Sequence, residues 1–228
     1  MYLLAARCAL VSWCAVTLAS AQAPPAAGER AAYTGLFAAA TRGDAAAIEQ
    51  LAKQGADVKA RDGYGRTPLH VAAYASQRGA MRALVDAGAD PNTLEQDRYD
   101  IVTIAAVAND LAALQVALEL GGSARNVTSP YDGTALIAAA HLGHVEIVRE
   151  LIRAGAPLDH VNNLGWTAVI ESIVLGDGGT RHTATLAALV DAGANVNLAD
   201  RSGTTPLALA RARHYREMAA LLEAKRAR

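Results

Sequence analysis

The sequence is short of aromatic residues and cysteine, and it carries almost no net charge. Aromatic residues make up 4% of its 228 residues, whereas hydrophobic residues of all kinds make up 52%. A core of alanine and aliphatic side chains suits closely packed helices better than a thick globular centre. The formal net charge of −1 gives no general attraction to nucleic acid or to an anionic membrane, so we expect neither as a partner.

The two cysteines, Cys8 and Cys14, both lie in an N-terminal stretch with the pattern of a secretory signal. Arg7 precedes an apolar run that ends at Leu18, and small residues follow up to Ala21. We expect cleavage after Ala21, which leaves a chain without thiols and excludes disulfides, thiol catalysis and cysteine-bound metal. The alternative is an uncleaved membrane anchor, although the apolar run is only about half the length of a membrane span.

Behind the predicted signal peptide (residues 1–21), residues 22–32 are predicted to be a short mobile linker, and the sequence then repeats itself from Tyr33 onward. Glycines that follow an aliphatic run recur at intervals of 33, 33, 34 and 38 residues: Gly55, Gly88, Gly121, Gly155 and Gly193. The residues that open the apolar segments keep nearly the same period: Thr34, Thr67, Asp100, Thr134, Thr167 and Thr205. Two independent markers with one period predict a solenoid of stacked units.

Each unit is predicted to hold two short helices. The opening Thr or Asp can accept hydrogen bonds from the free amides of a helix start, and Pro68 and Pro206 suit the first helical position. Gly43, Gly143 and Gly176 are placed to end the first helix in a left-handed conformation. The predicted units are residues 33–62, 63–95, 96–128, 129–162, 163–200 and 201–228.

Three segments, "GRTPLHVAA", "DGTALIAAAHLGHVEIVRELIRAGA" and "DAGANVNLADRSGTTPLALA", resemble ankyrin repeats. The resemblance extends from Tyr33 to the end of the chain. It implies an all-α solenoid of about six repeats, including degenerate caps, with projecting turns called fingers beside a concave groove. It also implies a structural hydrogen bond between His70 and the Thr67 hydroxyl. We expect a monomer that binds a protein or peptide and needs neither cofactor nor metal.

Four successive fingers each place one large aromatic residue at the predicted tip: Tyr64, Tyr99, Tyr131 and Trp166. The other predicted tip residues are Arg66, Asp97, Asn163 and Leu164. Exposed Tyr and Trp side chains with an occasional Arg are typical of binding surfaces, so we predict that these residues contact a partner. The alternative is that each ring only packs against the neighbouring finger.

Glu171 stands at a first-helix position that holds an aliphatic residue or alanine in other units. One turn further along this face lie Tyr74 and His141 of other units, and the resemblance places the face in the groove. Because Glu171 and His141 belong to adjacent units, their side chains could approach each other. Glu171 is then a solvated groove residue, stiffens the groove through a hydrogen bond to His141, or anchors a basic group of the partner.

Five extra residues, Asp177 to Arg181, separate Gly176 from His182 and account for the interval of 38. Insertions in solenoids tend to fall on one face, which is often the binding face. The alternative is a loop that the fold merely tolerates. We therefore include Asp177, Arg181 and His182 among the candidate partner-binding residues.

The sequence contains no paired-histidine zinc motif, no phosphate loop and no nucleophile elbow. It therefore predicts a non-enzymatic binding module of the bacterial cell envelope, located in the periplasm. A narrower alternative is an inhibitor or immunity-type protein that blocks an exported enzyme. A hydrolase that uses Glu171, Asp177 and His182 is a third possibility, but no nucleophile with an orienting base accompanies these residues.

The signal-peptide hypothesis predicts that the exported protein begins at or near Gln22 and contains no thiol. Intact-mass analysis of protein recovered from the periplasm tests it. A mass that still includes Cys8 and Cys14 would contradict the prediction.

Overall fold

The computed structural model describes residues 22–225 and residue 227, which form thirteen α-helices. The predicted signal peptide lies outside the described residues. In chain order the helices are α1 (Ala27–Ala32), α2 (Gly35–Arg42), α3 (Ala45–Lys53), α4 (Pro68–Tyr74), α5 (Arg78–Asp86), α6 (Ile101–Val107), α7 (Leu111–Glu119), α8 (Ala135–Leu142), α9 (Val145–Arg153), α10 (Ala168–Val174), α11 (Thr180–Asp191), α12 (Pro206–Ala212) and α13 (Arg216–Ala224). In the described part of the chain, no helix is long and apolar enough to cross a bilayer.

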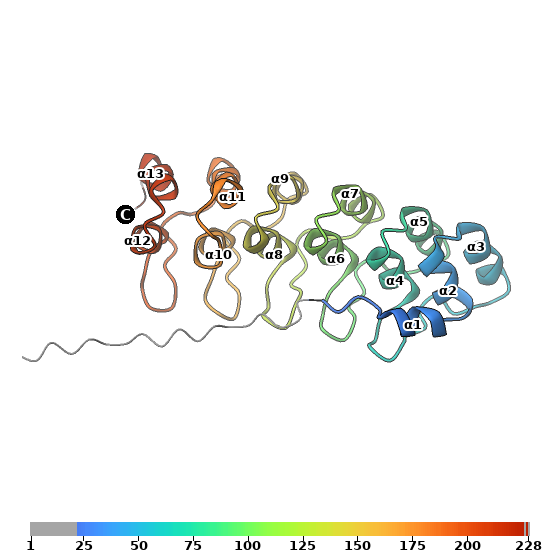
Figure 1. The fold of residues 1–228 in the computed structure, drawn as a ribbon. Coiled ribbons are helices and arrows are strands. Elements are labelled where there is room, and N and C mark those ends of the chain that lie inside the picture. Colours follow the sequence, from blue (N-terminus) through green and yellow to red (C-terminus); the bar gives the residue numbers. More distant parts are fainter. Residues whose placement is uncertain (1–21, 226, 228) are drawn as a thin grey trace, which may run out of the picture.

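The helices after α1 form six pairs that stack in a row (Figure 1). The first helices, α2, α4, α6, α8, α10 and α12, form one layer, and the second helices, α3, α5, α7, α9, α11 and α13, form the other (Figure 1). Five long turns, the fingers, join consecutive units and project from the layer of first helices (Figure 1). We define the first to fifth fingers as residues 56–66, 89–99, 122–133, 156–166 and 194–204. The predicted all-α solenoid of helix pairs is confirmed.

All six predicted helix starts are confirmed, and the predicted side-chain bond to the helix start is present in five of them. Thr67, Asp100, Thr134, Thr167 and Thr205 each precede a first helix and accept a hydrogen bond from its third amide. This bond satisfies one of the amides that a helix start leaves without an intrahelical partner. Thr34 stands at the same place before α2 without a side-chain bond.

The predicted helix ends hold for two of three glycines. Gly43 and Gly143 follow α2 and α8 in the left-handed conformation, with φ of 74° and 69°. Gly176 does not share it, because α10 already ends at Val174. Glycine is required there for space instead, since a Cβ at Gly176 would lie 2.1 Å from the carbonyl oxygen of Ser172.

The core is one continuous apolar cluster that runs through all six units and consists mainly of alanine, leucine, isoleucine and valine. Leu136 and Leu151, one on each helix of the fourth unit, are both at 0% exposure. No pair of helices has a separate core, so each unit depends on its neighbours for burial.

Hydrogen bonds also cross the unit boundaries. His144 and His182 lie near the starts of the second helices α9 and α11. Each donates a ring N–H to a carbonyl on the first helix of the preceding unit, His144 to Ala106 over 3.0 Å and His182 to His141 over 2.9 Å. In the last unit, the Tyr215 hydroxyl donates over 3.0 Å to the Gly176 carbonyl, just past the end of α10. These bonds reach carbonyls at or just past the C-terminal ends of the short first helices, and they fix the spacing between units.

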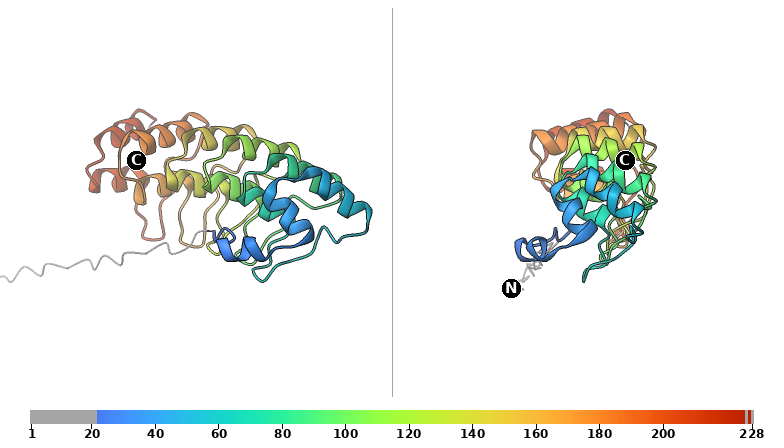
Figure 2. Two further views of the ribbon diagram at one scale, coloured as in Figure 1. Left: turned by 45° about the vertical axis from the view of Figure 1, so that its right-hand side comes forward. Right: turned by 90° about the vertical axis from the view of Figure 1, so that its right-hand side faces the viewer.

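The prediction of a mobile linker over residues 22–32 is wrong. Residues 27–32 form α1, and the segment before it lies alongside the fingers rather than continuing the row of helix pairs (Figures 1 and 2). Contacts with Arg66, which is only 1% exposed, hold the segment in place. Composition alone could not show this contact, because its partner lies more than thirty residues further along the chain.

Leu136→Ala should lower the free energy of unfolding by about 2–5 kcal/mol, because a fully buried leucine leaves a cavity when it is truncated. Val161→Ala is the matched control, since Val161 is 49% exposed, and it should change stability by less than about 0.5 kcal/mol. Urea denaturation followed by circular dichroism measures both. Equal midpoints for the two variants would show that Leu136 is not a core residue.

Candidate partner-binding surface

The tip of each finger is closed by a polar side chain that accepts backbone amides from the same turn. In the fourth finger, Asn162 Oδ1 accepts the amides of Leu164 and Trp166, each at 3.0 Å. The main-chain amide of Asn162 in turn donates to the main-chain carbonyl of Trp166 over 3.0 Å. The residues with the corresponding role in the other fingers are Asp62, Glu95, Ser129 and Asp200. The tips are therefore rigid turns rather than mobile loops.

Main-chain hydrogen bonds join the first four fingers to one another. The amides of Gln96, Ser129 and Asn163 each donate to a carbonyl of the preceding finger, over 2.9–3.1 Å. The accepting carbonyls belong to Tyr64, Arg98 and Tyr131. The first four fingers thus form one continuous surface, which a partner can contact as a unit.

Three of the four predicted tip aromatics reach this surface. Tyr64 is 49% exposed, and Tyr131 and Trp166 are half-buried. The prediction that Tyr99 is exposed is wrong, since it is 3% exposed and belongs to the core. Burial raises the pKa of Tyr99 to about 12, and its hydroxyl bonds the backbone of Gln22.

The remaining predicted tip residues differ in depth. Asn163 is exposed and its amide group donates to the Pro130 carbonyl over 3.1 Å, while Asp97 and Leu164 are half-buried. Arg66 is buried, contrary to its predicted place at an exposed tip. Its guanidinium lies 4.5 Å from the Tyr64 ring, which covers it from the solvent side.

Glu171 and His141 do approach each other across the boundary between units four and five. Glu171 is 4% exposed, and its Oε1 accepts a 2.9 Å hydrogen bond from Asn162 Nδ2. Its Oε2 lies 3.6 Å from His141 Nδ1, which is longer than a hydrogen bond. The carboxyl therefore braces the fourth finger and makes only a loose contact with the histidine.

Burial opposes charge on both members of this pair. It raises the pKa of Glu171 to about 7, against the smaller opposing effect of the Asn162 hydrogen bond. It also lowers the pKa of His141, and His182 and His144 lower it further. Near neutral pH the pair is thus held together without a strong charge attraction.

The five inserted residues do not form a free loop. Asp177 to Gly179 make a turn, and Thr180 and Arg181 form the start of α11, which is the longest second helix. Asp177 Oδ1 lies 2.8 Å from His182 Nδ1 and accepts the Gly179 amide at 2.9 Å. These two hydrogen bonds lower the pKa of Asp177.

Of the predicted residues in and around this insertion, only Asp177 and Arg181 are exposed, whereas His182 is 6% exposed. Because His182 also donates to the His141 carbonyl, the structure places it between two units rather than on the surface.

The predicted hydrogen bond between His70 and the Thr67 hydroxyl is present at 2.8 Å, and His70 Nδ1 also accepts the Thr67 amide. On the other side of the ring, Nε2 donates to the carbonyls of Thr93 and Tyr99. Burial lowers the pKa of His70 to about 4, so the ring stays neutral. Its role is to join the first helix of unit two to the following finger.

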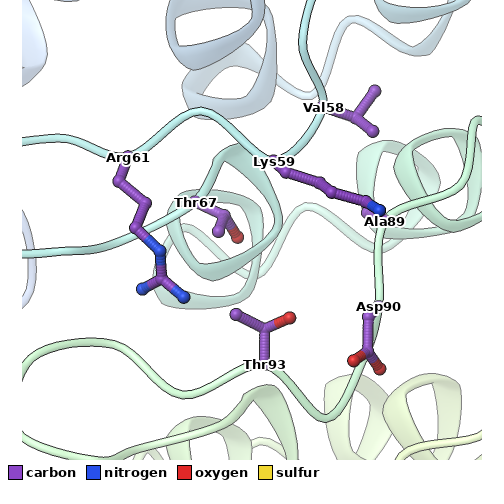
Figure 3. Close-up of a pocket in the computed structure, with 7 residues that line it drawn as sticks. All are labelled: Val58, Lys59, Arg61, Thr67, Ala89, Asp90 and Thr93. Atoms are coloured by element: carbon purple, nitrogen blue, oxygen red, sulfur yellow. The ribbon is translucent and has the colours of Figure 1, made fainter.

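A small cleft of about 190 Å³ lies between the first and second fingers, lined by Val58, Lys59, Arg61, Thr67, Ala89, Asp90 and Thr93 (Figure 3). Its volume is below the several hundred Å³ of a typical small-molecule site. Arg61 reaches across it and donates to the Gly65 and Leu94 carbonyls. No group of His, Cys, Asp and Glu side chains within the described ranges could hold a metal ion.

Two residues of this surface were missed in the sequence. Asn162 could have been found, because the finger-closing residues Asp62, Asn162 and Asp200 keep the spacing of the repeat. Glu29 could not, because it lies outside the repeat and reaches Arg66 only through the fold.

A family model described as "Ankyrin repeats (3 copies)" matches residues 5–95 and 102–178, which is well over half of the sequence. The chain belongs to the ankyrin repeat family. The ankyrin repeat protein YahD of Escherichia coli (strain K12) is 35% identical over 185 residues, which cover 81% of this chain and 92% of that protein.

Solved structures agree with this assignment. The crystal structure of an ankyrin repeat domain from Acinetobacter baumannii AYE has a TM-score of 0.80 at 43% identity and covers 85% of this chain and 98% of that one. The ankyrin repeat protein EF0377 has a TM-score of 0.74 at 27% identity, with coverage of 84% and 98%. Ankyrin repeats are generally protein-interaction modules and are typically non-catalytic.

Glu171→Gln should remove a pH dependence of stability. Because the pKa of Glu171 is about 7 in the folded protein and near 4.5 when unfolded, the folded state binds more protons between these values. The wild type should therefore lose about 2–3 kcal/mol relative to the glutamine variant as the pH rises from 4.5 to 8. Thermal melts of both proteins across this range measure the difference, and parallel curves would contradict the prediction.

Proposed function

We propose that this chain is a non-enzymatic protein-binding module of the bacterial cell envelope, acting in the periplasm. Its partner docks across the third and fourth fingers and the first helices beside them. The binding residues in this region are Tyr131, His141, Asn163, Leu164, Trp166 and Glu171. The bacterial relatives support the bacterial assignment, and the signal-like pattern that ends at Ala21 supports export.

The observation that carries the proposal is the buried carboxyl of Glu171. A buried carboxyl with a single hydrogen bond costs stability, and an aliphatic side chain in its place is often neutral or stabilising. Ile104 and Ala138 occupy the corresponding positions of the two preceding units. A residue that is unfavourable for the stack and borders a rigid finger with a half-buried tryptophan fits recognition better than packing.

The geometry favours a partner that presents a hydrogen-bond donor beside an apolar contact. Glu171 Oε2 and His141 Nδ1 are too far apart to satisfy each other, so a donor from the partner gains a bond that the free protein lacks. Trp166 offers a large apolar face on a finger that Asn162 holds rigid. A lysine or arginine side chain on the partner meets both requirements.

Trp166→Ala should weaken partner binding by about 2 kcal/mol, because central aromatic anchors carry much of the affinity of an interface. It should change the free energy of unfolding by less than about 1 kcal/mol. The partner is first captured from an envelope fraction with the wild-type chain and identified by mass spectrometry. Titration calorimetry and thermal melts then compare wild type, Trp166→Ala and Glu171→Gln.

Arg149→Ala is the control, because Arg149 is exposed on α9 in the layer of second helices and should leave affinity unchanged. If Trp166→Ala lowers the melting temperature while binding per folded molecule stays the same, the tryptophan is a packing residue and the proposed surface is wrong. If the partner is an exported enzyme, its activity at saturating chain shows whether binding also inhibits it.

A further inference from the structure

We propose that the fingers of units two and three form a second peptide-binding site, and that residues 22–29 are its resident ligand. The ligand class is a peptide with small side chains and a proline, followed four residues later by a carboxylate in the first turn of a short helix. This inference rests on the proposed binding function and adds a site, a ligand class and a competing internal segment to it.

The centre of the site is the guanidinium of Arg66. Its Nε donates to Asp62 over 2.7 Å, within the same finger. Its two other nitrogens donate to the N-terminal segment, Nη1 to the Ala23 carbonyl over 3.1 Å and Nη2 to Glu29 Oε1 over 2.8 Å. The buried guanidinium thus donates hydrogen bonds to a main-chain carbonyl and to a carboxylate of the same peptide. These two groups define the ligand.

The segment makes further contacts of the kind that a bound peptide makes. Pro25 is buried, whereas the residues on either side of it are exposed. The backbone of Gln22 bonds the hydroxyl of Tyr99 on the next finger. Glu29 Oε2 accepts the Ala26 amide over 2.6 Å, which turns the carboxylate toward Arg66. The segment therefore crosses two fingers in succession, as an external peptide would.

A structural cap for the end of the solenoid would look different. Such a cap buries apolar side chains against the outermost repeat, yet α1 has no buried residue. The bonds from Arg66 and Tyr99 bypass the outer face of unit one and reach units two and three. A few polar contacts and one buried proline make a ligand that can leave without opening the core.

The short connection to α2 keeps this ligand in place. A short flexible tether holds a ligand at a millimolar effective concentration, so even a weak intramolecular contact keeps the site occupied. A partner peptide must compete with it, and its apparent affinity falls by the fraction of time that the site is closed. Loss of the Glu29 carboxylate should therefore open the site to a peptide added from outside.

The test uses a fluorescent synthetic peptide with the sequence of residues 22–33, titrated into the full chain and followed by anisotropy. The Glu29→Gln chain should bind the peptide at least about tenfold more tightly than the wild type, because its own segment has lost a charge-assisted bond. The Glu49→Gln chain is the matched control: Glu49 is exposed on α3, and this variant should bind as the wild type does.

A second peptide carries glutamine in place of Glu29 and should bind the Glu29→Gln chain at least about tenfold more weakly than the first. Equal binding of both peptides, equal affinity of all three chains, or no binding to the Glu29→Gln chain would each overturn the proposal. Thermal melts confirm that the variants remain folded.

Hydrogen exchange on the wild-type chain gives an independent measurement. Saturating peptide should speed the exchange of the amides in α1 and leave those in α8 unchanged, because only the resident segment is displaced. Unchanged exchange in α1 would show that the peptide does not take its place. If the peptide does not bind but Trp166→Ala still weakens partner binding, this inference is refuted and the proposed function stands.

Discussion

No helix pair in this protein can bury its apolar side chains by itself, and every other feature depends on this constraint. Helices of seven to twelve residues are marginal in isolation, so each becomes stable only against the units on either side. Alanines such as Ala72, Ala105 and Ala139, all at 0% exposure, let consecutive first helices approach closely. The bonds that His144 and His182 make to preceding helices then fix the spacing that this packing allows.

The fingers are regularly spaced because the helix pairs below them stack regularly. Because the units repeat, the fingers repeat, and the polar exceptions inside the array stand out against an apolar background. Arg66 and Glu171 are both nearly inaccessible and both lie where a first helix meets a finger, but they differ in their surroundings. The N-terminal segment satisfies Arg66, whereas Glu171 has only Asn162 and a distant histidine. Units two and five therefore differ in how their buried polar side chains are satisfied.

The repeat itself could be predicted from the sequence, because the caps and glycines that mark it obey local rules. The burial of individual side chains could not be predicted. The spacing places Tyr99 on a finger, but only the packing of the surrounding segments shows that its ring is buried. Gly176 does not end a helix in the left-handed conformation. Glycine also occurs where a Cβ would collide with a neighbouring atom, and the sequence does not distinguish the two cases. The order of residues 22–32 depends on an ion pair between Glu29 and Arg66, which no local pattern encodes. For the candidate site, the approach of His141 to Glu171 was predictable from the repeat. The bond between Asn162 and Glu171 was not, because it depends on how the finger folds against α10.

The ladder of main-chain bonds between fingers ends at the fourth. Within the described residues, no hydrogen bond between two main-chain groups joins the fourth finger to the fifth. The Asn195 amide instead donates to the Asp159 carboxylate over 2.8 Å, and the Arg201 side chain lies against Gly165. Viewed as an elastic rod, the array is coupled by main-chain bonds between fingers over units two to five, whereas side chains such as Asp159 and Tyr215 couple the last unit to it. A substitution of one of these side chains would therefore loosen the last unit alone and leave the backbone bonds between the other fingers in place.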